Sequence, residues 1–237
     1  MTKERSRWIA LIFISAAISL VIIDGTIVNT IFPSVINALN LDSTEVQWVQ
    51  ESYVLVFAAL LLVWGSIADR IGRKRLLLIG IAIFVAASVW AGFSEDASSM
   101  ILARVAQGFG GSMVLPTTLS LVNATFQGKE RGIAFAVWGA TIGGMVAVGP
   151  VLGGWLATDF GDDGWRLAFN INLPLGVIVM AGLMWWAKES KQDQRVPGVD
   201  IVGALLSVVM FATLVFGLIE GRVYGWWDAS TKNQFVL

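Results

Sequence analysis

Long stretches without a charged residue recur along the 237-residue chain, and short segments between them hold most of its charge. A helix needs roughly 20 apolar residues to cross about 30 Å of hydrocarbon, whereas a barrel strand needs only about ten. A helix also satisfies its own backbone hydrogen bonds in lipid. Seven stretches approach or exceed the helical length: residues 8–23, 52–68, 76–94, 105–127, 132–158, 167–187 and 201–219. The first of them continues past Asp24 to Leu41. We predict an all-α polytopic membrane protein with seven transmembrane helices.

Composition narrows the classes of protein that fit this pattern. Hydrophobic residues make up 56% of the chain and charged residues 14%, as expected for a protein solvated by lipid. The sequence has no Cys and no His, which excludes disulfides, thiol nucleophiles and imidazole chemistry. We expect no metal site, no cofactor, no enzymatic activity and no nucleic-acid partner. The basic amino-terminal residues also fit a secretory signal peptide, but the length of the first stretch and the helices after it favour a membrane span.

Lys and Arg are distributed unevenly between the segments that join the predicted helices. Positive residues in short loops stay on the cytoplasmic side of a membrane. One set of alternating segments carries Lys3, Arg5, Arg7, Arg70, Arg73, Lys74, Arg75, Lys129, Arg131, Lys188, Lys191 and Arg195, whereas the other set carries only Arg166, Arg222 and Lys232. We therefore predict a multi-pass protein of the plasma (inner) membrane with a cytoplasmic amino terminus, and expect this chain to end outside the cytoplasm.

The segment GSIADRIGRKR, residues 65–75, joins the second and third predicted helices and places five charges in positions 69–75. A basic loop can serve membrane topology alone. However, Gly65 permits close approach to a neighbouring helix, Asp69 can pair at the helix end, and Gly72 permits a tight reversal. We interpret the segment as a gating loop at the cytoplasmic face, formed by Gly65, Asp69, Arg70, Gly72, Arg73, Lys74 and Arg75.

This loop resembles the GxLADRxGRRR signature between the second and third helices of the major facilitator superfamily. Four further motifs occur in the order expected of that family: DGTIVNTIFP at 24–33, RVAQGFGGS at 104–112, GPVLGG at 149–154 and WRLAFNINLPLG at 165–176. The first and last of these resemble motifs of the fourteen-span drug:proton antiporters. Gly149, Pro150, Gly153 and Gly154 resemble the antiporter motif of the fifth helix, although Met145 stands where that motif usually has Gly.

The resemblance implies a domain organisation. Residues 1–187 would form the six-helix amino-terminal bundle of the family, made of two inverted three-helix repeats. Residues 188–200 would form a cytoplasmic linker, residues 201–219 an additional transmembrane helix, and residues 220–237 an external segment leading to a carboxy-terminal half. We also expect Pro116, Pro150 and Pro174 to interrupt the fourth, fifth and sixth helices.

Ionisable residues inside the predicted helices mark the candidate site. An ionisable side chain at the helix centre costs about 2.5 to 3.5 kcal/mol on insertion scales, so Asp24 and Arg104 must face a partner or a water-filled cavity. Glu51 lies at a similar depth. We expect Asp24 and Arg104 to couple transport to protons, as the resemblance implies, and substrate to contact Asp24, Glu51, Asn29 and Gln107. The alternative is a static ion pair that holds two helices together.

The resemblance implies proton-coupled export of small lipophilic, often cationic, drugs by alternating access. Its partners would be the lipid bilayer, protons, the drug and the carboxy-terminal half. A symporter or facilitator for a small polar metabolite is the main rival, because the loop motif occurs in such carriers too. A seven-helix retinal receptor is disfavoured because residues 201–219 contain no Lys, and an intramembrane enzyme because catalytic groups do not converge.

Overall fold

The computed structural model describes residues 3–191 and 201–226, and none of these residues lies in a β-strand. The chain first forms the long helices α1 (Lys3–Leu39), α2 (Ser43–Ile71), α3 (Arg73–Gly92), α4 (Ala97–Thr125) and α5 (Gly128–Asp159). A short 3-10 turn, η1 (Gly161–Asp163), then leads into α6 (Gly164–Asn170), α7 (Asn172–Trp186) and α8 (Ile201–Val223). The predicted all-α fold is confirmed.

Polar residues between the apolar stretches set where the helices begin and end. The Asp42 carboxylate accepts hydrogen bonds from the amides of Thr44 and Glu45, and the Glu45 carboxylate accepts one from the Asp42 amide, which completes a capping box for α2. Asp96 caps α4 by accepting from the Ser99 amide at 2.7 Å. These caps lie at the same end of the bundle, in the loops that carry few basic residues.

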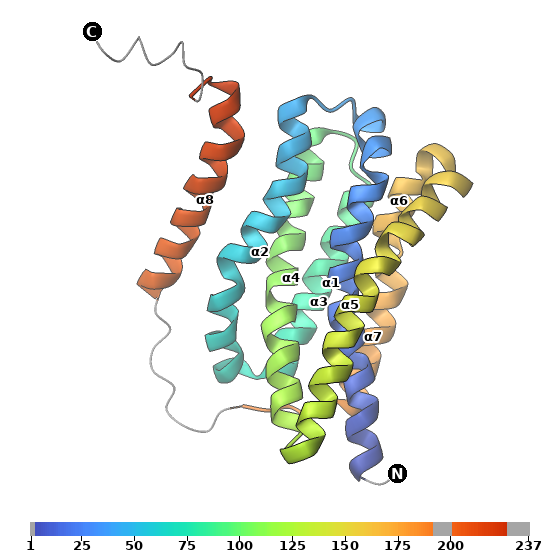
Figure 1. Ribbon diagram of the computed structural model, residues 1–237, viewed down its shortest axis with the longest axis vertical. Coiled ribbons are helices and arrows are strands. Elements are labelled where there is room, and N and C mark those ends of the chain that lie inside the picture. Colours follow the sequence, from blue (N-terminus) through green and yellow to red (C-terminus); the bar gives the residue numbers. More distant parts are fainter. Residues whose placement is uncertain (1–2, 192–200, 227–237) are drawn as a thin grey trace.

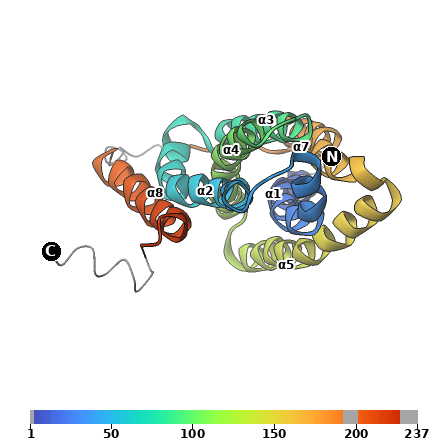
Figure 2. The ribbon, with the colours of Figure 1, turned by 90° about the horizontal axis from the view of Figure 1, so that it is seen from above.

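Helix α1 lies in the middle of the bundle, with α3 and α4 on one side and α5 on the other (Figures 1 and 2). Small residues allow the contact between α1 and α5. A Cβ atom added at Gly149 would collide with Thr26, and one added at Gly153 would lie 2.9 Å from Cβ of Thr30. The two glycines are four positions apart, so they share a face of α5 and bring the two backbones together.

Among the described residues, five segments are long and apolar enough to cross a membrane, namely residues 4–39, 43–71, 73–92, 128–159 and 164–186, the last of which joins α6 and α7. Helix α4 does not reach the same hydropathy, because it carries Arg104, Gln107 and many small residues. It still runs the height of the bundle beside α2 and α3 (Figure 1). Helix α8 lies at the edge of the bundle against α2, with the Trp48 and Phe216 rings 6.2 Å apart.

The predicted effect of proline is correct for one helix and wrong for two. The sixth span breaks at Ile171, because Pro174 cannot donate to the carbonyl four residues earlier and its ring crowds that carbonyl. Helices α4 and α5 continue through Pro116 and Pro150. Helices packed in a membrane bundle tolerate proline more readily than isolated helices do. Beside Pro116, the Thr117 hydroxyl bonds to the carbonyls of Met113 and Val114 in the preceding turn.

The end of the chain departs from the predicted boundaries. Helix α8 continues to Val223, four residues beyond the expected position 219, and ends before Gly225, whose φ of +64° is incompatible with a right-handed helix. The first residues of the expected linker at 188–200 lie on the bundle, where Glu189 and Ser190 contact α3. Residues 192–200 and 227–237 lie outside the described residues, so the linker and the external segment stay predictions.

The four basic segments predicted to share one membrane face do lie at one end of the bundle. Arg7 pairs with Glu130 at 3.3 Å, which joins the start of α1 to the start of α5. The Arg73 amide donates to the Ser190 carbonyl at 3.1 Å, which joins the loop between α2 and α3 to the segment after α7. We call this the basic end of the bundle, and its cytoplasmic location stays a prediction from charge.

Candidate functional site

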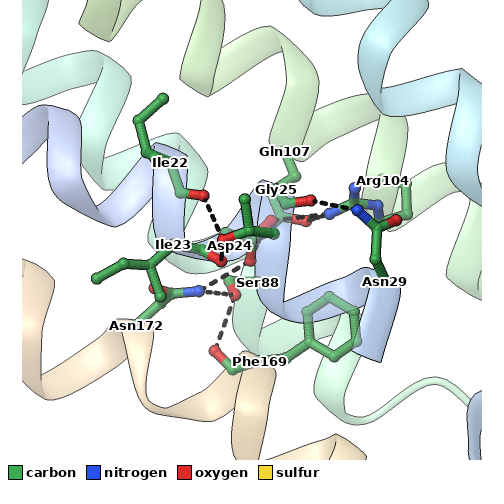
Figure 3. Close-up of polar contacts among 11 residues, drawn as sticks. Ile22, Ile23, Asp24, Gly25, Asn29, Ser88, Arg104, Gln107, Phe169 and Asn172 are labelled. Atoms are coloured by element: carbon green, nitrogen blue, oxygen red, sulfur yellow. Dashed lines mark hydrogen bonds and ion pairs between the residues drawn. The ribbon is translucent and has the colours of Figure 1, made fainter. Parts of the chain in front are cut away.

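A buried ion pair joins α1 to α4 in the core of the bundle (Figure 3). Nη1 of Arg104 donates to Oδ2 of Asp24 at 2.9 Å, and the side chains of Arg104 and Asp24 are 3% and 0% exposed. Both side chains were expected to need a partner, and each is the partner of the other. The pair brings together the two residues predicted to couple transport to protons.

Gln107 joins both members of this pair. Its Nε2 donates to Asp24 Oδ1 at 2.7 Å, and its Oε1 accepts from Arg104 Nη1 at 2.7 Å. Residues 104 and 107 are three positions apart on α4, so they share one face of the helix. The Gln107 side chain is therefore committed to the ion pair, and its predicted contact with substrate stays a prediction.

Two further polar side chains extend this network, and the sequence analysis identified neither. Asn172, the first residue of α7, donates from Nδ2 to Asp24 Oδ1 at 3.0 Å and to Ser88 Oγ at 2.8 Å. Ser88 on α3 donates in turn to the carbonyl oxygen of Phe169 at 2.8 Å. Asn172 belongs to the motif at 165–176, but one amide within a motif does not reveal that it faces Asp24.

The Tyr53 ring of α2 covers the guanidinium of Arg104. Arg104 Cζ lies 4.2 Å from the centroid of the ring, a distance typical of cation–π contacts. Gly108 allows this approach, because a Cβ atom added there would lie 2.6 Å from the Tyr53 carbonyl oxygen. Nε of Arg104 has no hydrogen-bond partner among the described residues. The positive charge is therefore balanced by one carboxylate, one amide oxygen and one aromatic face.

The other two predicted substrate contacts lie outside this network. Asn29 is exposed one turn along α1 from Asp24, and its Nδ2 donates to the Gly25 carbonyl at 3.4 Å (Figure 3). Glu51 on α2 is half-buried and makes no hydrogen bond or ion pair within the described part of the chain. The structure therefore connects neither side chain to Asp24, and both substrate contacts stay predictions.

The loop at 65–75 is held by contacts at the basic end of the bundle. Asp69 accepts from Arg73 Nη2 at 2.7 Å, which is the pairing expected for an acid at this helix end. Glu189, which the sequence analysis did not identify, accepts from the amides of Lys74 and Arg75 at 3.1 Å each. A carboxylate in this position caps the first turn of α3 and interacts favourably with the helix dipole.

The two glycines of this loop differ in their surroundings. Gly72 alone separates α2 from α3, and its φ of +119° confirms the predicted tight reversal. A Cβ atom there would lie 2.7 Å from the Glu189 carboxylate. A Cβ atom at Gly65 would have no neighbour within 4 Å among the described residues, so its helix contact stays a prediction. Arg70 lies exposed in the last turn of α2.

The motif GPVLGG divides between two faces of α5. Gly149 and Gly153 are buried against α1, whereas Pro150 is exposed and a Cβ atom at Gly154 would meet nothing within 4 Å. Met145 is half-buried and does not prevent the close contact, which begins one turn later at Gly149. The block of small residues therefore supports one close helix contact and leaves a second small-residue face open.

No group of three or more Asp or Glu side chains in the described segments is arranged to hold a metal ion. The chemistry available at the core site is the gain or loss of a proton by Asp24, the one carboxyl in the network around Arg104.

Comparison with known proteins decides the family. Residues 14–226 match the family model described as the Major Facilitator Superfamily. The chain belongs to the major facilitator superfamily. The predicted resemblance is thus confirmed over most of the sequence.

Curated relatives of this major facilitator chain include antibiotic transport and resistance proteins. The chain is 37% identical over 221 residues to a probable actinorhodin transporter of Streptomyces coelicolor, a match that covers 93% of this chain and 38% of that protein. It is 37% identical over 232 residues to puromycin resistance protein pur8 of Streptomyces alboniger, covering 98% and 45%. The chain thus spans less than half the length of these two relatives.

Among solved structures, the fold is similar to that of a bacterial homologue of the human lysosomal transporter Spinster in its inward-facing, unoccupied conformation. The TM-score is 0.68 at 20% sequence identity, and the match covers 83% of this chain and 46% of that chain. The likeness supports the major facilitator bundle fold seen here, with the Asp24–Arg104 pair in its core.

Proposed function

We propose that this chain is the amino-terminal part of a proton-coupled exporter of small lipophilic, often cationic, drugs that works by alternating access. The observation that carries the proposal is the Asp24 carboxylate, which is buried in the bundle and balanced by a single guanidinium. Antibiotic transport and resistance in the names of two relatives support export of such compounds. The carboxy-terminal half would supply the second bundle needed for alternating access.

A proton on Asp24 would change the charge balance of the core. While Asp24 is ionised, its charge and that of Arg104 compensate at 2.9 Å. A proton from water that adds to the carboxylate leaves the guanidinium uncompensated in a medium of low dielectric, which is strongly unfavourable. A cationic drug and a proton would therefore compete for the negative charge of one carboxylate. Such competition is what exchange of a drug for a proton requires.

The remaining motifs have proposed roles in the movement of the helices. Residues 65–75 would gate the cytoplasmic face, because Asp69 and Arg73 pair within this loop and Glu189 joins it to the segment after α7. On α5, Gly149 and Gly153 would let the helix slide on α1, and Pro150 and Gly154 would face the carboxy-terminal half. We place the amino terminus in the cytoplasm and the bundle, residues 1–187, in the plasma membrane.

The test uses the transporter expressed from its full reading frame in everted membrane vesicles. ATP-driven proton pumping acidifies the lumen, and a pH-sensitive dye reports the gradient. We expect addition of puromycin or ethidium to release protons from vesicles that carry the wild-type protein. Asp24→Asn should abolish the release. Asp159→Asn, the same change at an exposed carboxyl near the outer end of α5, should leave it intact.

The outcomes separate the candidate functions. Normal drug-driven proton release by an inserted Asp24→Asn variant would overturn the role of this carboxyl and favour the static ion pair. Proton movement in the same direction as the compound would favour a symporter. Uptake of compound without any proton movement would favour a facilitator.

A further inference from the structure

In the described part of the chain, every group that hydrogen-bonds to the Asp24 carboxylate is a donor. Oδ2 accepts from Arg104, and Oδ1 accepts from the amide nitrogens of Gln107 and Asn172. A protonated carboxyl has an O–H group that must itself donate. The arrangement seen here therefore suits the ionised form, and an added proton would find no acceptor unless one of the three neighbours changes.

Two of the three neighbours cannot turn an acceptor toward Asp24. Arg104 has five N–H donors and no acceptor. Gln107 has an amide oxygen, but that oxygen accepts from Arg104 Nη1 at 2.7 Å. Because Arg104 can only donate, a flip of the Gln107 amide would place two donors against each other. Gln107 is therefore fixed in its orientation by the guanidinium.

Asn172 is the neighbour that can reverse. Its Nδ2 donates to Ser88 Oγ, and the single hydroxyl proton of Ser88 is used on the Phe169 carbonyl. If the Asn172 amide flips, its oxygen can accept from a protonated Asp24 and also from the Ser88 hydroxyl, which rotates toward it. The reversal breaks no covalent bond. Its consequence is that the Phe169 carbonyl loses the Ser88 hydrogen bond.

The hydrogen bond that would be lost crosses the break in the sixth span. Phe169 lies near the end of α6, Asn172 is the first residue of α7, and Ser88 on α3 holds both. We propose that Asn172 is a positioning residue that detects whether Asp24 carries a proton and passes that state to the break between α6 and α7. The inference rests on the proposed function, since it assumes that Asp24 exchanges a proton during transport.

The titratable and charged groups near Asp24 lie on helices other than α3 and α7, which carry Ser88 and Asn172. Of the titratable groups on the packed helices, Arg104 of α4 contacts the carboxylate directly, and Tyr53 of α2 lies over Arg104. Helices α3 and α7 bring only the uncharged Ser88 and Asn172 to the network, and α5 meets α1 there through glycines. A change at position 172 would therefore alter hydrogen bonding to Asp24 without altering charge.

The experiment measures the protonation of Asp24 itself. Infrared difference spectra of the purified full transporter in lipid nanodiscs, recorded against pH, report the carboxyl C=O band, and its loss in Asp24→Asn assigns it. We expect Asn172→Leu, which keeps the volume and removes the amide, to move the midpoint of this band to higher pH by about one unit, a tenfold change in proton concentration. Asn170→Leu is the matched control, because the Asn170 amide lies beside Gly92 and is not among the hydrogen-bond partners of Asp24, and its midpoint should equal that of the wild type.

A second variant keeps the test informative if Asn172→Leu fails to fold. Ser88→Ala removes the group that holds the amide in its present orientation, so the amide can turn at little cost and the midpoint should again move to higher pH. In the Asn172→Leu background, Ser88→Ala should add no further shift, because Ser88 acts through Asn172. Shifts that add independently, or an unchanged midpoint in both single variants, would overturn the inference.

These outcomes differ from a failure of the proposed function. If the wild-type transporter releases no protons when drug is added, the proposed function fails, and if an inserted Asp24→Asn variant still releases them, the role of Asp24 in proton coupling fails, whatever the spectra show. If the vesicle assay confirms Asp24 but the Asn172→Leu midpoint equals that of the wild type, the positioning role of Asn172 fails alone.

Discussion

The Asp24–Arg104 pair makes a quantitative prediction about stability. Two unit charges about 4 Å apart interact by about 4 kcal/mol at an effective dielectric constant of about 20. Removal of one partner from a buried pair costs about 3 to 5 kcal/mol, whereas replacement of both by uncharged residues is often neutral or stabilising. Because both side chains are at least 97% buried, we expect Asp24→Asn and Arg104→Met each to destabilise the protein, and the double variant to recover most of the loss.

Thermal unfolding of the purified full transporter measures this double-mutant cycle. A change of about 3 kcal/mol corresponds to roughly 6 to 12 °C in Tm for a domain of this size. The pair Arg7–Glu130 is the internal control, since its side chains are 35% and 36% exposed at 3.3 Å, and exposed pairs contribute at most about 1 kcal/mol. Additive losses at Asp24 and Arg104 would show that the two charges do not compensate each other, which refutes the reasoning.

Three further predictions concern local packing and capping. Gly153→Ala should destabilise the protein by about 1 to 3 kcal/mol through overpacking against α1. Gly154→Ala should not, because a Cβ atom there meets nothing within 4 Å, and thermal unfolding measures both variants. Gly72→Ala should cost about 1 to 3 kcal/mol because its φ is +119°, while Gly65→Ala should be neutral or slightly stabilising in the same assay. Glu189→Ala should cost about 0.5 to 2 kcal/mol and speed hydrogen exchange in the first turn of α3, and unchanged exchange there would contradict the cap.

The helices were predictable because lipid imposes a length and a hydrogen-bonding requirement that each stretch must meet alone. The residues at which the helices begin and end were less predictable. Helix α4 begins at Ala97, eight positions before the uncharged stretch that predicted it, because Arg104 belongs to the helix and is paired within the bundle. The uncharged stretch alone therefore marks only part of this helix, whereas the prediction that Arg104 lies inside the helix and has a partner is confirmed.

The charged members of the site were predictable for a related reason. An acid or a base in an apolar helix is costly enough to require a partner, so Asp24 and Arg104 are conspicuous in the sequence. A buried amide or hydroxyl costs much less, and polar residues such as Asn172 and Ser88 are common in membrane helices. Only the three-dimensional packing shows that both reach the same carboxylate from helices far apart in the chain.

The sixth span and the segment after it contact α3 at three levels, from Gly92 past the Asp24–Arg104 pair to the basic end of the bundle. At the end opposite the basic end, Arg166 donates to the carbonyl of Gly92 at 2.9 Å, and at the basic end Glu189 caps the first turn of α3. Between them lies the Ser88 bond to Phe169, next to the break. The contacts at Gly92 and at the first turn of α3 do not involve Ser88, so they would persist when the Ser88–Phe169 bond is lost, and a change of angle at the break would then displace α3, which is separated from α2 by Gly72 alone. A proton on Asp24 would therefore act on the charged loop through α3, without any direct contact between the two sites.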